Sequence, residues 1–303
     1  MIGIAFTVMC LIFGTTFLAI KVGVEAGLPP FLSAGARFMT AGAILFIAMR
    51  LSGKARWSLL WRKEMLLIGT GTTFGTFSTL YWAEQYVSSG IGAILSATGP
   101  MMIVLMQSAI LRQKTTRITL MGCMISFLGV VLVVLPGLTV QVSGLWLAGC
   151  IAILLGELCY SGGALYSKRV MDAFRDTNPI ALNAAQMFHG GWMLLVLSAF
   201  TEPWNSEGWN LLPAMGSLFY LILFGSMIAQ TLFYWLMART NPLFPTTWLY
   251  ISPPIAVGLG AFLYGEHVSW WMLAGVLLIV TGLMCMNNGI IRLVNRRKVR
   301  SAA

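Results

Sequence analysis

Charged residues are scarce in this chain of 303 amino acids. Only 9% are Asp, Glu, Lys or Arg, against about 25% in an average soluble domain, and 58% are hydrophobic. The mean hydropathy is +0.84. A soluble fold has too little interior to hide this much apolar surface. The composition therefore predicts a protein that lies in a lipid bilayer.

The chain also lacks the motifs of familiar enzymes. It has no HExxH, no CxxC, no clustered His and Asp residues, no nucleophile with a base nearby in sequence, and no GxxxxGK[ST] loop for ATP. Its five cysteines all fall in apolar segments, where we interpret them as reduced packing residues. The net charge of +10 comes without an Arg-rich soluble patch, so nucleic acid is not an expected partner. We predict no enzymatic activity, no cofactor and no metal site.

Apolar runs long enough to cross a bilayer recur along the whole sequence. A hydrocarbon core of about 30 Å needs roughly 20 residues of helix. Ten such runs are present, joined by connections too short to form a separate domain. The predicted helices are 2–21, 31–49, 64–86, 90–111, 117–135, 143–167, 179–200, 214–238, 243–264 and 269–288. We therefore predict an all-α membrane protein with ten transmembrane helices.

Basic residues divide the connections into two classes. Of the 19 Lys and Arg residues, all but Lys21 and Arg37 lie in alternate connections or in the C-terminal tail. The other connections carry acidic residues, namely Glu84, Glu202, Glu207 and Glu266. The positive-inside rule then predicts that both termini are cytoplasmic. We expect the protein in the plasma (inner) membrane of a bacterium.

The two halves of the chain resemble each other. A shift of 153 residues aligns them without a gap from the third helix to the fifth. Identical residues then coincide: Tyr81 and Trp82 with Tyr234 and Trp235, Pro100 with Pro253, Gly122 with Gly275, and Gly129 with Gly282. A repeat of five helices crosses the membrane an odd number of times, so the second copy enters from the opposite side. Inverted repeats of this kind are typical of secondary transporters, whose substrate site lies between the halves.

Four stretches carry a resemblance to a known family. They are FGTTFLAIKVG at 13–23, LPPFLSAGARF at 28–38, AEQYVSSGIGAILSATGP at 83–100 and ISPPIAVGLGAFLYGEHVSWWMLAGVLLIVTG at 251–282. In these stretches the chain resembles the EamA branch of the ten-helix drug/metabolite transporter superfamily. The resemblance implies a central cavity lined mainly by helices 1–4 and 6–9, with helices 5 and 10 as peripheral support. It also implies secondary transport, commonly outward, of small metabolites, amino acids or drugs.

The repeat and the resemblance set the domain organisation. We assign residues 1–137 to the first EamA repeat, 143–289 to the second, and 290–303 to a basic cytoplasmic tail. The halves differ at one acidic position, because Glu266 in the second repeat corresponds to Gln113 in the first. A carboxylate near a helix end often serves as a cap, so we interpret Glu266 as structural.

Four ionisable residues in or near the predicted helices are functional candidates, because a buried charge there costs about 2.5–3.5 kcal/mol on insertion scales. Glu157 and His189 lie well inside helices 6 and 7, and either a proton or substrate site or a structural hydrogen bond fits each. Lys21 lies at the outer end of helix 1, where it can snorkel and pair with Glu25. Arg37 lies roughly 10 Å below the outer surface and needs a fixed partner, such as backbone carbonyls or Glu25. Bracing and substrate contact fit Arg37 equally well.

Arg37 and Glu157 also lead to a hypothesis about the substrate. If both face one cavity, they can hold the carboxylate and the amine of an amino acid or another small zwitterion. Aromatic and small polar residues of helices 3, 4, 7, 8 and 9 complete the predicted cavity. They are Tyr81, Trp82, Ser96, Thr98, Gln186, Gln230, Tyr234, Trp248 and Tyr250. Pro100, Pro253 and Pro254 are expected to break hydrogen bonding in helices 4 and 9, which either frees carbonyls for substrate or simply bends the helix.

These observations lead to one functional prediction. We expect a secondary active transporter that exports small metabolites such as amino acids, or drugs, by alternating access. Its expected partners are the lipid bilayer and a small-molecule substrate, with protons or a counter-substrate open as coupling partners. The alternatives are a membrane channel, which normally needs a ring of like groups that Glu157 alone does not supply, and an integral membrane enzyme.

Overall fold

The protein is helical throughout the part of the chain that the structure describes, and no strand occurs there. In this computed structural model the described residues are 2–109, 112, 116–139, 144–203, 208–240, 245 and 247–301. Among them, six stretches are long and apolar enough to cross a membrane, and three shorter helices are apolar as well. Together with the interrupted helix at residues 63–83, they account for the ten crossings predicted from the sequence.

The first half of the chain contributes five crossings, of which the third and fourth are interrupted. Its elements are α1 (Ile2–Glu25), α2 (Pro30–Leu51), η1 (Trp57–Leu59), α3 (Lys63–Gly69), η2 (Thr70–Gly75), α4 (Thr76–Ala83), α5 (Ser89–Ser96), α6 (Gly99–Ala109) and α7 (Arg117–Thr139). The third crossing combines α3, η2 and α4, and the fourth combines α5 and α6. In the third crossing η2 has the sequence TGTTFG, and in the fourth crossing Ala97 and Thr98 separate α5 from α6.

The second half repeats this order. Its elements are α8 (Gly144–Ala173), α9 (Pro179–Thr201), α10 (Leu211–Tyr220), η3 (Leu221–Ile228), α11 (Ala229–Arg239), α13 (Trp248–Tyr264) and α14 (Trp270–Ser301). The eighth crossing combines α10, η3 and α11. The last helix continues to Ser301, through residues that the sequence assigns to a separate tail.

The third and eighth crossings contain π-helical segments at equivalent places. A shift of 153 residues moves η2, Thr70–Gly75, onto residues 223–228, and η3 spans Leu221–Ile228. A π-helical turn holds more residues than an α-helical turn and frequently occurs at functional sites. The two halves therefore share a π-helical segment at the same place, although the amino-acid sequences of the two segments differ.

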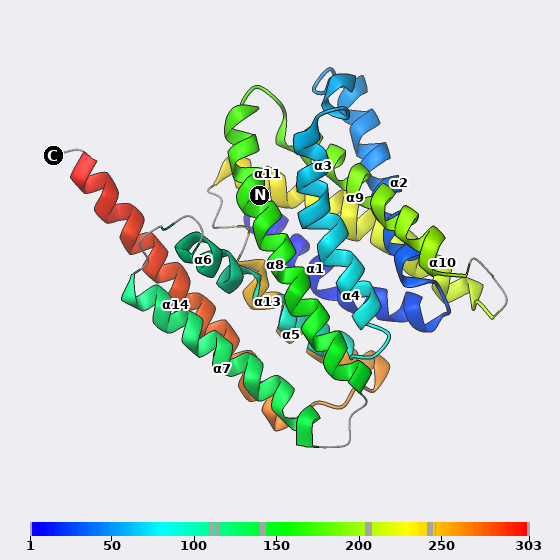
Figure 1. Ribbon diagram of the computed structural model, residues 1–303, viewed down its shortest axis with the longest axis vertical. Helices are drawn as coiled ribbons and strands as arrows, with labels where there is room; N and C mark the ends of the chain where they lie inside the picture. Colours follow the sequence, from blue (N-terminus) through cyan, green and yellow to red (C-terminus); the bar gives the residue numbers. More distant parts are fainter. Residues whose placement is uncertain are drawn as a thin grey trace.

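Helices α7 and α14 lie side by side along one edge of the molecule (Figure 1). Glycines bring their backbones together, because a Cβ at Gly122 would lie 2.5 Å from the carbonyl oxygen of Gly282. A Cβ at Gly129 would likewise lie 2.7 Å from the carbonyl oxygen of Gly275. The 153-residue shift relates Gly122 to Gly275 and Gly129 to Gly282, so it turns one glycine pair into the other. The contact thus has the symmetry of an inverted repeat, with small residues at the seam as is usual between membrane helices.

The centre of this seam is a contact between Ser126 and Ile279. The Ser126 hydroxyl donates a hydrogen bond to the carbonyl oxygen of Ile279, with an Oγ to O distance of 3.3 Å. These two residues are themselves equivalent under the 153-residue shift. The two-fold axis that relates the repeats therefore passes through the contact between Ser126 and Ile279.

Helices α2 and α9 form a second antiparallel pair, and this pair is also related by the symmetry between the two repeats. A Cβ at Gly42 would lie 2.6 Å from the backbone nitrogen of Phe188, and a Cβ at Gly191 would lie 2.8 Å from Met39 Cα. A shift of 149 residues places Gly42 on Gly191 and Met39 on Phe188. This shift is shorter than 153 because more residues separate α9 from η3 than separate α2 from η2. The two repeats thus meet along two symmetric helix pairs.

Candidate functional site

Arg37 is buried where α2, α4 and η3 meet. Its guanidinium donates hydrogen bonds from Nε to Ser226 Oγ at 2.8 Å and from Nη1 to Tyr81 Oη at 3.1 Å. The rings of Phe38 and Phe77 have their centroids 4.6 and 5.4 Å from Arg37 Cζ, within cation–π range. No carboxylate of the described residues forms an ion pair with Arg37. Hydroxyls and rings therefore replace the partners expected from the sequence, and we call Arg37, Ser226 and Tyr81 the Arg37 brace.

Gln186 makes the corresponding contact in the other half of the molecule. The shift of 149 residues places Arg37 on Gln186, and the shift of 153 residues places Thr73 on Ser226. Gln186 Oε1 accepts hydrogen bonds from Thr73 Oγ1 at 2.8 Å and from Thr72 Oγ1 at 2.9 Å. We call Gln186, Thr72 and Thr73 the Gln186 brace. Each brace joins a helix of one repeat to the π-helical segment of the other.

The two braces lie at opposite depths in the molecule. Arg37 and Gln186 each follow by seven residues the proline that begins their helix, Pro30 in α2 and Pro179 in α9. Seven residues of helix span about 10 Å. Because α2 and α9 are antiparallel, one brace lies toward one membrane face and the other brace lies toward the opposite face.

Lys21 is held at the junction of α1 with the α4–α5 connection. Its Nζ donates hydrogen bonds to the carbonyl oxygens of Glu84 at 2.7 Å and Val87 at 3.0 Å. It also lies 3.5 Å from Glu25 Oε1, so the predicted ion pair with Glu25 is present. Only 12% of the Lys21 side chain is exposed. Main-chain carbonyls thus hold this ammonium group, and snorkelling to water does not describe it.

Glu84 is completely buried, although the sequence groups it with the acidic residues of the connections. Its exposed fraction is 0%, and neither carboxylate oxygen has a hydrogen-bond partner in the described part of the chain. The absence of a side chain at Gly92 makes room for it, because a Cβ there would lie 2.8 Å from Glu84 Oε1. Sequence reasoning missed this residue because a position just beyond a helix end is normally solvated.

Glu157 lies on α8 against the interruption of the fourth crossing. α5 ends at Ser96 and α6 begins at Gly99, one residue before Pro100. A Cβ at Gly99 would lie 2.6 Å from Glu157 Oε2, and only 6% of Glu157 is exposed. The carboxylate therefore faces the point where the helix next to Pro100 is broken.

The structure does not bring Glu157 and Arg37 together. Gly156, the neighbour of Glu157, packs against α4, since a Cβ there would lie 3.2 Å from the carbonyl oxygen of Thr76. Arg37 contacts a different face of α4, the face that carries Tyr81. The two charges approach α4 from different directions, so the hypothesis that they clamp one zwitterion gains no support from this arrangement.

His189 and Trp248, two further candidates, have structural partners. His189 Nε2 lies 2.8 Å from the carbonyl oxygen of Leu60, which is in the connection between α2 and α3. The ring of Trp248 packs on Phe13, with the centroids 4.6 Å apart. These contacts join α9 to that connection and α13 to α1, and neither brings its candidate to an Arg37 or Gln186 brace.

The remaining expectations concern Tyr234, the two prolines of α13, Tyr250 and Gln113. Tyr234 is half-buried on α11, beside Phe233. Pro253 and Pro254 lie inside α13, and the helix continues through both. A proline has a φ close to the helical value, so losing its N–H leaves a carbonyl unpaired without ending the helix. The side chain of Tyr250 and the whole of Gln113 lie outside the described residues.

Two acidic residues serve the ends of neighbouring helices. Glu266 Oε1 accepts hydrogen bonds from Ser89 N at 2.8 Å and Ser89 Oγ at 2.7 Å, and Oε2 accepts one from Gly90 N at 3.2 Å. The predicted capping role of Glu266 is thus confirmed, and the helix it caps is α5. Glu202 does the same for α2, accepting from Phe31 N at 2.7 Å and Leu32 N at 2.9 Å. Both carboxylates lie at the positive ends of helix dipoles.

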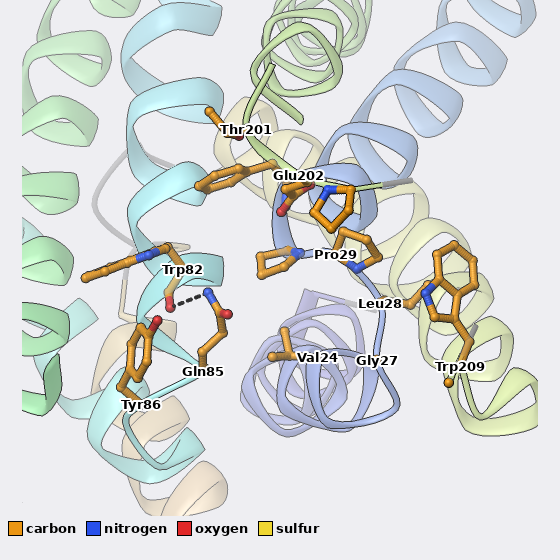
Figure 2. A pocket seen from close by; sticks show the side chains of 14 residues that line it. Val24, Gly27, Leu28, Pro29, Trp82, Gln85, Tyr86, Thr201, Glu202 and Trp209 are labelled. Atoms are coloured by element: carbon orange, nitrogen blue, oxygen red, sulfur yellow. Dashed lines mark hydrogen bonds between the residues drawn. The ribbon is translucent and has the colours of Figure 1, made fainter. Parts of the chain in front are cut away.

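A pocket of about 620 Å³ lies between the α1–α2 connection, the end of α4 and the end of α9 (Figure 2). Trp82, one of the predicted cavity residues, lines this pocket, and Gln85 Nε2 donates a hydrogen bond to the carbonyl oxygen of Trp82 at 3.1 Å. The other principal lining residues are Phe31, Tyr86, Glu202 and Trp209. Because Glu202 is engaged by α2, the pocket presents aromatic surface with a few polar groups, as small-molecule sites do.

The paired crossings and the symmetric seams are an arrangement that is typical of membrane transporters with inverted repeats. The model of the EamA-like transporter family matches residues 1–135 and 147–288. The chain therefore belongs to the EamA-like transporter family, and it is a membrane-embedded transporter.

Relatives of known sequence and structure agree with this assignment. The chain is 30% identical to the "Uncharacterized inner membrane transporter YedA" of Escherichia coli strain K12, over 91% of this chain and 88% of that protein. It is 24% identical to "Protein PecM" of Dickeya dadantii, over 97% of this chain and 94% of that protein. A solved structure, described only as the crystal structure of a protein, matches with a TM-score of 0.65 at 18% identity and covers 97% of both chains. That match shows the shared fold.

Proposed function

We propose that the protein is a secondary active transporter that exports small metabolites or drugs by alternating access. The observation that carries this proposal is the pair of equivalent braces at opposite depths. In an inverted-repeat carrier the two halves exchange conformations between the outward-open and inward-open states. A contact that closes one side must then have a counterpart that closes the other. Arg37 with Ser226 and Gln186 with Thr73 stand in this relation.

The π-helical segments supply the movable partners of the braces. Arg37 contacts η3, and Gln186 contacts η2. A π-helical turn is a natural place for a helix to bend, because its hydrogen bonds are less regular than those of an α-helix. Opening of the Arg37 brace exposes the substrate site to one side, and opening of the Gln186 brace exposes it to the other.

The basic connections favour an orientation with both termini in the cytoplasm of the inner membrane. In that orientation the Arg37 brace and the pocket of about 620 Å³ face outward. Cysteines that replace Lys54 and Arg169 are expected to be shielded from impermeant thiol reagents in intact cells. Cysteines that replace Gln85 and Asn210 are expected to react, in a background without the native cysteines. Reaction at position 54 in sealed cells would overturn the orientation.

The pocket supports a small amphiphilic substrate. Its volume of about 620 Å³ lies within the range of roughly 300–1,000 Å³ that is usual for small-molecule sites. Aromatic side chains such as Trp82 and Trp209 suit an apolar group, whereas Gln85 suits a polar one. Amino acids with apolar side chains have this mixed chemistry.

Flux measurements with purified protein in liposomes test the proposal. Radiolabelled apolar amino acids are expected to enter at a saturable rate, and unlabelled amino acid inside the liposomes is expected to accelerate entry. This stimulation from the opposite side is characteristic of a carrier. Ion conductance without saturation would instead identify a channel and overturn alternating access. Liposomes without protein provide the control.

A further inference from the structure

A second set of ionisable groups lies where α1, α4 and α5 meet, next to the Arg37 brace through Tyr81. Lys21 and Glu25 come from α1, Glu84 follows α4, and Glu266 comes from the connection between α13 and α14. Tyr81 lies one turn before Glu84 on α4. These are the titratable groups that surround Glu84 within the described residues. These groups differ in whether hydrogen bonds or ion pairs compensate their charges.

Three of the four charged groups have partners. Glu266 uses both carboxylate oxygens on the first residues of α5. Glu25 is 44% exposed and pairs with Lys21. Lys21 also donates to two main-chain carbonyls. Glu84 alone among them is fully buried with both oxygens unpartnered in the described part of the chain.

The surroundings of the Glu84 carboxyl group suit its neutral form. An ionised carboxylate accepts several hydrogen bonds, and burying it without donors is far more costly than burying the neutral acid. A Cβ at Gly92 would lie 2.8 Å from Glu84 Oε1 and 3.7 Å from a ring carbon of Phe17. The backbone of Gly92 therefore lies against the carboxyl group, and it offers no side-chain donor on this side.

Lys21 is placed to compensate Glu84 when the proton leaves. Its Nζ already lies 2.7 Å from the main-chain oxygen of Glu84, while its ionic partner is Glu25. A lysine side chain is long and freely rotatable, so a change of rotamer can move the ammonium from one carboxylate to the other. Two arrangements follow: protonated Glu84 with a Lys21–Glu25 pair, and ionised Glu84 with a Lys21–Glu84 pair.

We propose that Glu84 is the proton-binding site that couples proton movement to transport, with Lys21 as its counter-ion after the proton is released. This inference rests on the proposed transport function and names its coupling ion. The proton binds a carboxylate oxygen of Glu84 from the outer aqueous side, where its neighbours Gln85 and Tyr86 line the pocket. When the proton is released, Glu84 becomes ionised and the ammonium of Lys21 turns from Glu25 to Glu84.

Infrared difference spectroscopy of the full-length protein in lipid tests the site without any substrate. A protonated-carboxyl band that persists above the pH range in which exposed carboxyl groups ionise, and disappears as pH rises further, is expected in the wild type and is expected to be missing in Glu84→Gln. Asp172→Asn replaces an exposed carboxylate, 65% exposed, and is expected to match the wild type. A Glu84→Gln spectrum that also matches the wild type would overturn the proposal.

Two further variants keep the test decisive if Glu84→Gln does not fold. Lys21→Gln removes the nearby cation, so the midpoint of the carboxyl titration is expected to move to higher pH by about 1 to 3 units. Glu25→Gln frees Lys21 for Glu84, so the midpoint is expected to move to lower pH. Midpoints unchanged in both variants would sink the idea of a shared ammonium.

Transport in liposomes links the site to function. An imposed pH gradient is expected to accelerate wild-type and Asp172→Asn flux of a radiolabelled amino acid, and to leave the rate of Glu84→Gln unchanged. If the wild-type flux is saturable but its rate does not change with the pH gradient, proton coupling is overturned while the transporter proposal stands. Absence of flux for every amino acid tested would overturn the proposed substrate class, and the infrared titration then decides about Glu84 by itself.

Discussion

Arg37 and Gln186 hold equivalent positions in the two repeats, yet one brace carries a charge and the other is neutral. Arg37 donates to one hydroxyl of η3 and one of α4, while Gln186 accepts from two hydroxyls of η2. Hydrogen bonds from a charged donor are roughly twice as strong as neutral ones. A symmetric frame thus carries two contacts of unequal strength. The comparison teaches that the repeat sets where the two contacts lie, and that single side chains set which contact is stronger.

The same contrast between a charged and a neutral contact appears at the N-termini of α2 and α9, the helices that carry Arg37 and Gln186. The first turn of α2 is capped by Glu202, which comes from the end of α9. The first turn of α9 is capped by its own Asn178, whose Oδ1 accepts from Ile180 N at 2.9 Å. Arg37 therefore lies on a helix whose N-terminal cap, Glu202, is also charged and comes from the other repeat.

Loss of the Arg37 brace is expected to have the largest effect. Arg37→Ala leaves the hydroxyls of Ser226 and Tyr81 without their donor, which costs about 3 kcal/mol in the state where the brace is closed. Counterflow of a radiolabelled amino acid in liposomes is expected to fall by about a hundredfold. Arg37→Lys keeps the charge but loses the planar fork, so an intermediate rate is expected. A rate close to wild type in Arg37→Ala would remove the brace from the cycle.

Substitutions at the α7–α14 seam come next and test the symmetry itself. Gly122→Val and Gly275→Val each place atoms where the opposite backbone lies, at a cost of about 1–3 kcal/mol. Equivalent positions predict equal losses, seen as equal decreases in the thermal midpoint of the purified protein. Gly144→Val is the control, because a Cβ at Gly144 meets nothing within 4 Å. Unequal losses at Gly122 and Gly275 would show that the two sides of the seam are not equivalent.

Removal of the neutral brace is expected to have a smaller effect. Gln186→Ala removes a neutral acceptor from Thr72 and Thr73, worth about 1 kcal/mol, so counterflow is expected to fall by about fivefold. The measurement is the same as for Arg37→Ala. A loss equal to or greater than that of Arg37→Ala would refute the ranking of the two braces by charge.

The caps give the smallest expected differences. Asn178→Ala removes a neutral cap and is expected to cost about 1 kcal/mol of stability. Glu202→Gln keeps an acceptor for α2 but removes the favourable charge at the helix start, a cost of about 0.5 kcal/mol. Thermal unfolding in detergent ranks the two. A larger loss for Glu202→Gln would show that the charge, and not the hydrogen bond alone, holds α2 in place.

Hydropathy and repetition predicted much of the fold from the sequence. Ten apolar runs correspond to the crossings, and identical residues 153 positions apart indicated the internal repeat. The contact between α7 and α14, where the glycines among them lie, was not predicted. The pairing of Lys21 with Glu25 followed from their spacing of four residues, and the cap at Glu266 followed from its place near a helix end. These features depend on local spacing, which a sequence displays directly.

The braces and Glu84 depend on contacts between distant segments, which spacing does not display. Arg37 and Gln186 are equivalent under a different shift from that of the later helices, so a single alignment without gaps conceals them. The π-helical segments TGTTFG and LILFGSMI share little sequence. Burial of Glu84 depends on Gly92 and on the approach of α1, and neither is visible from its own neighbours.

The contact between Ser126 and Ile279 shows what a single chain permits at its two-fold axis. In a dimer of two identical five-helix chains with this symmetry, the position on the axis would meet an identical residue of the other chain. In a single chain made of two different repeats, each repeat can carry its own residue at this position. Here serine faces isoleucine, and the serine hydroxyl donates to the main-chain carbonyl of Ile279. The axis is therefore a place where two different side chains complement each other, which two identical chains could not achieve.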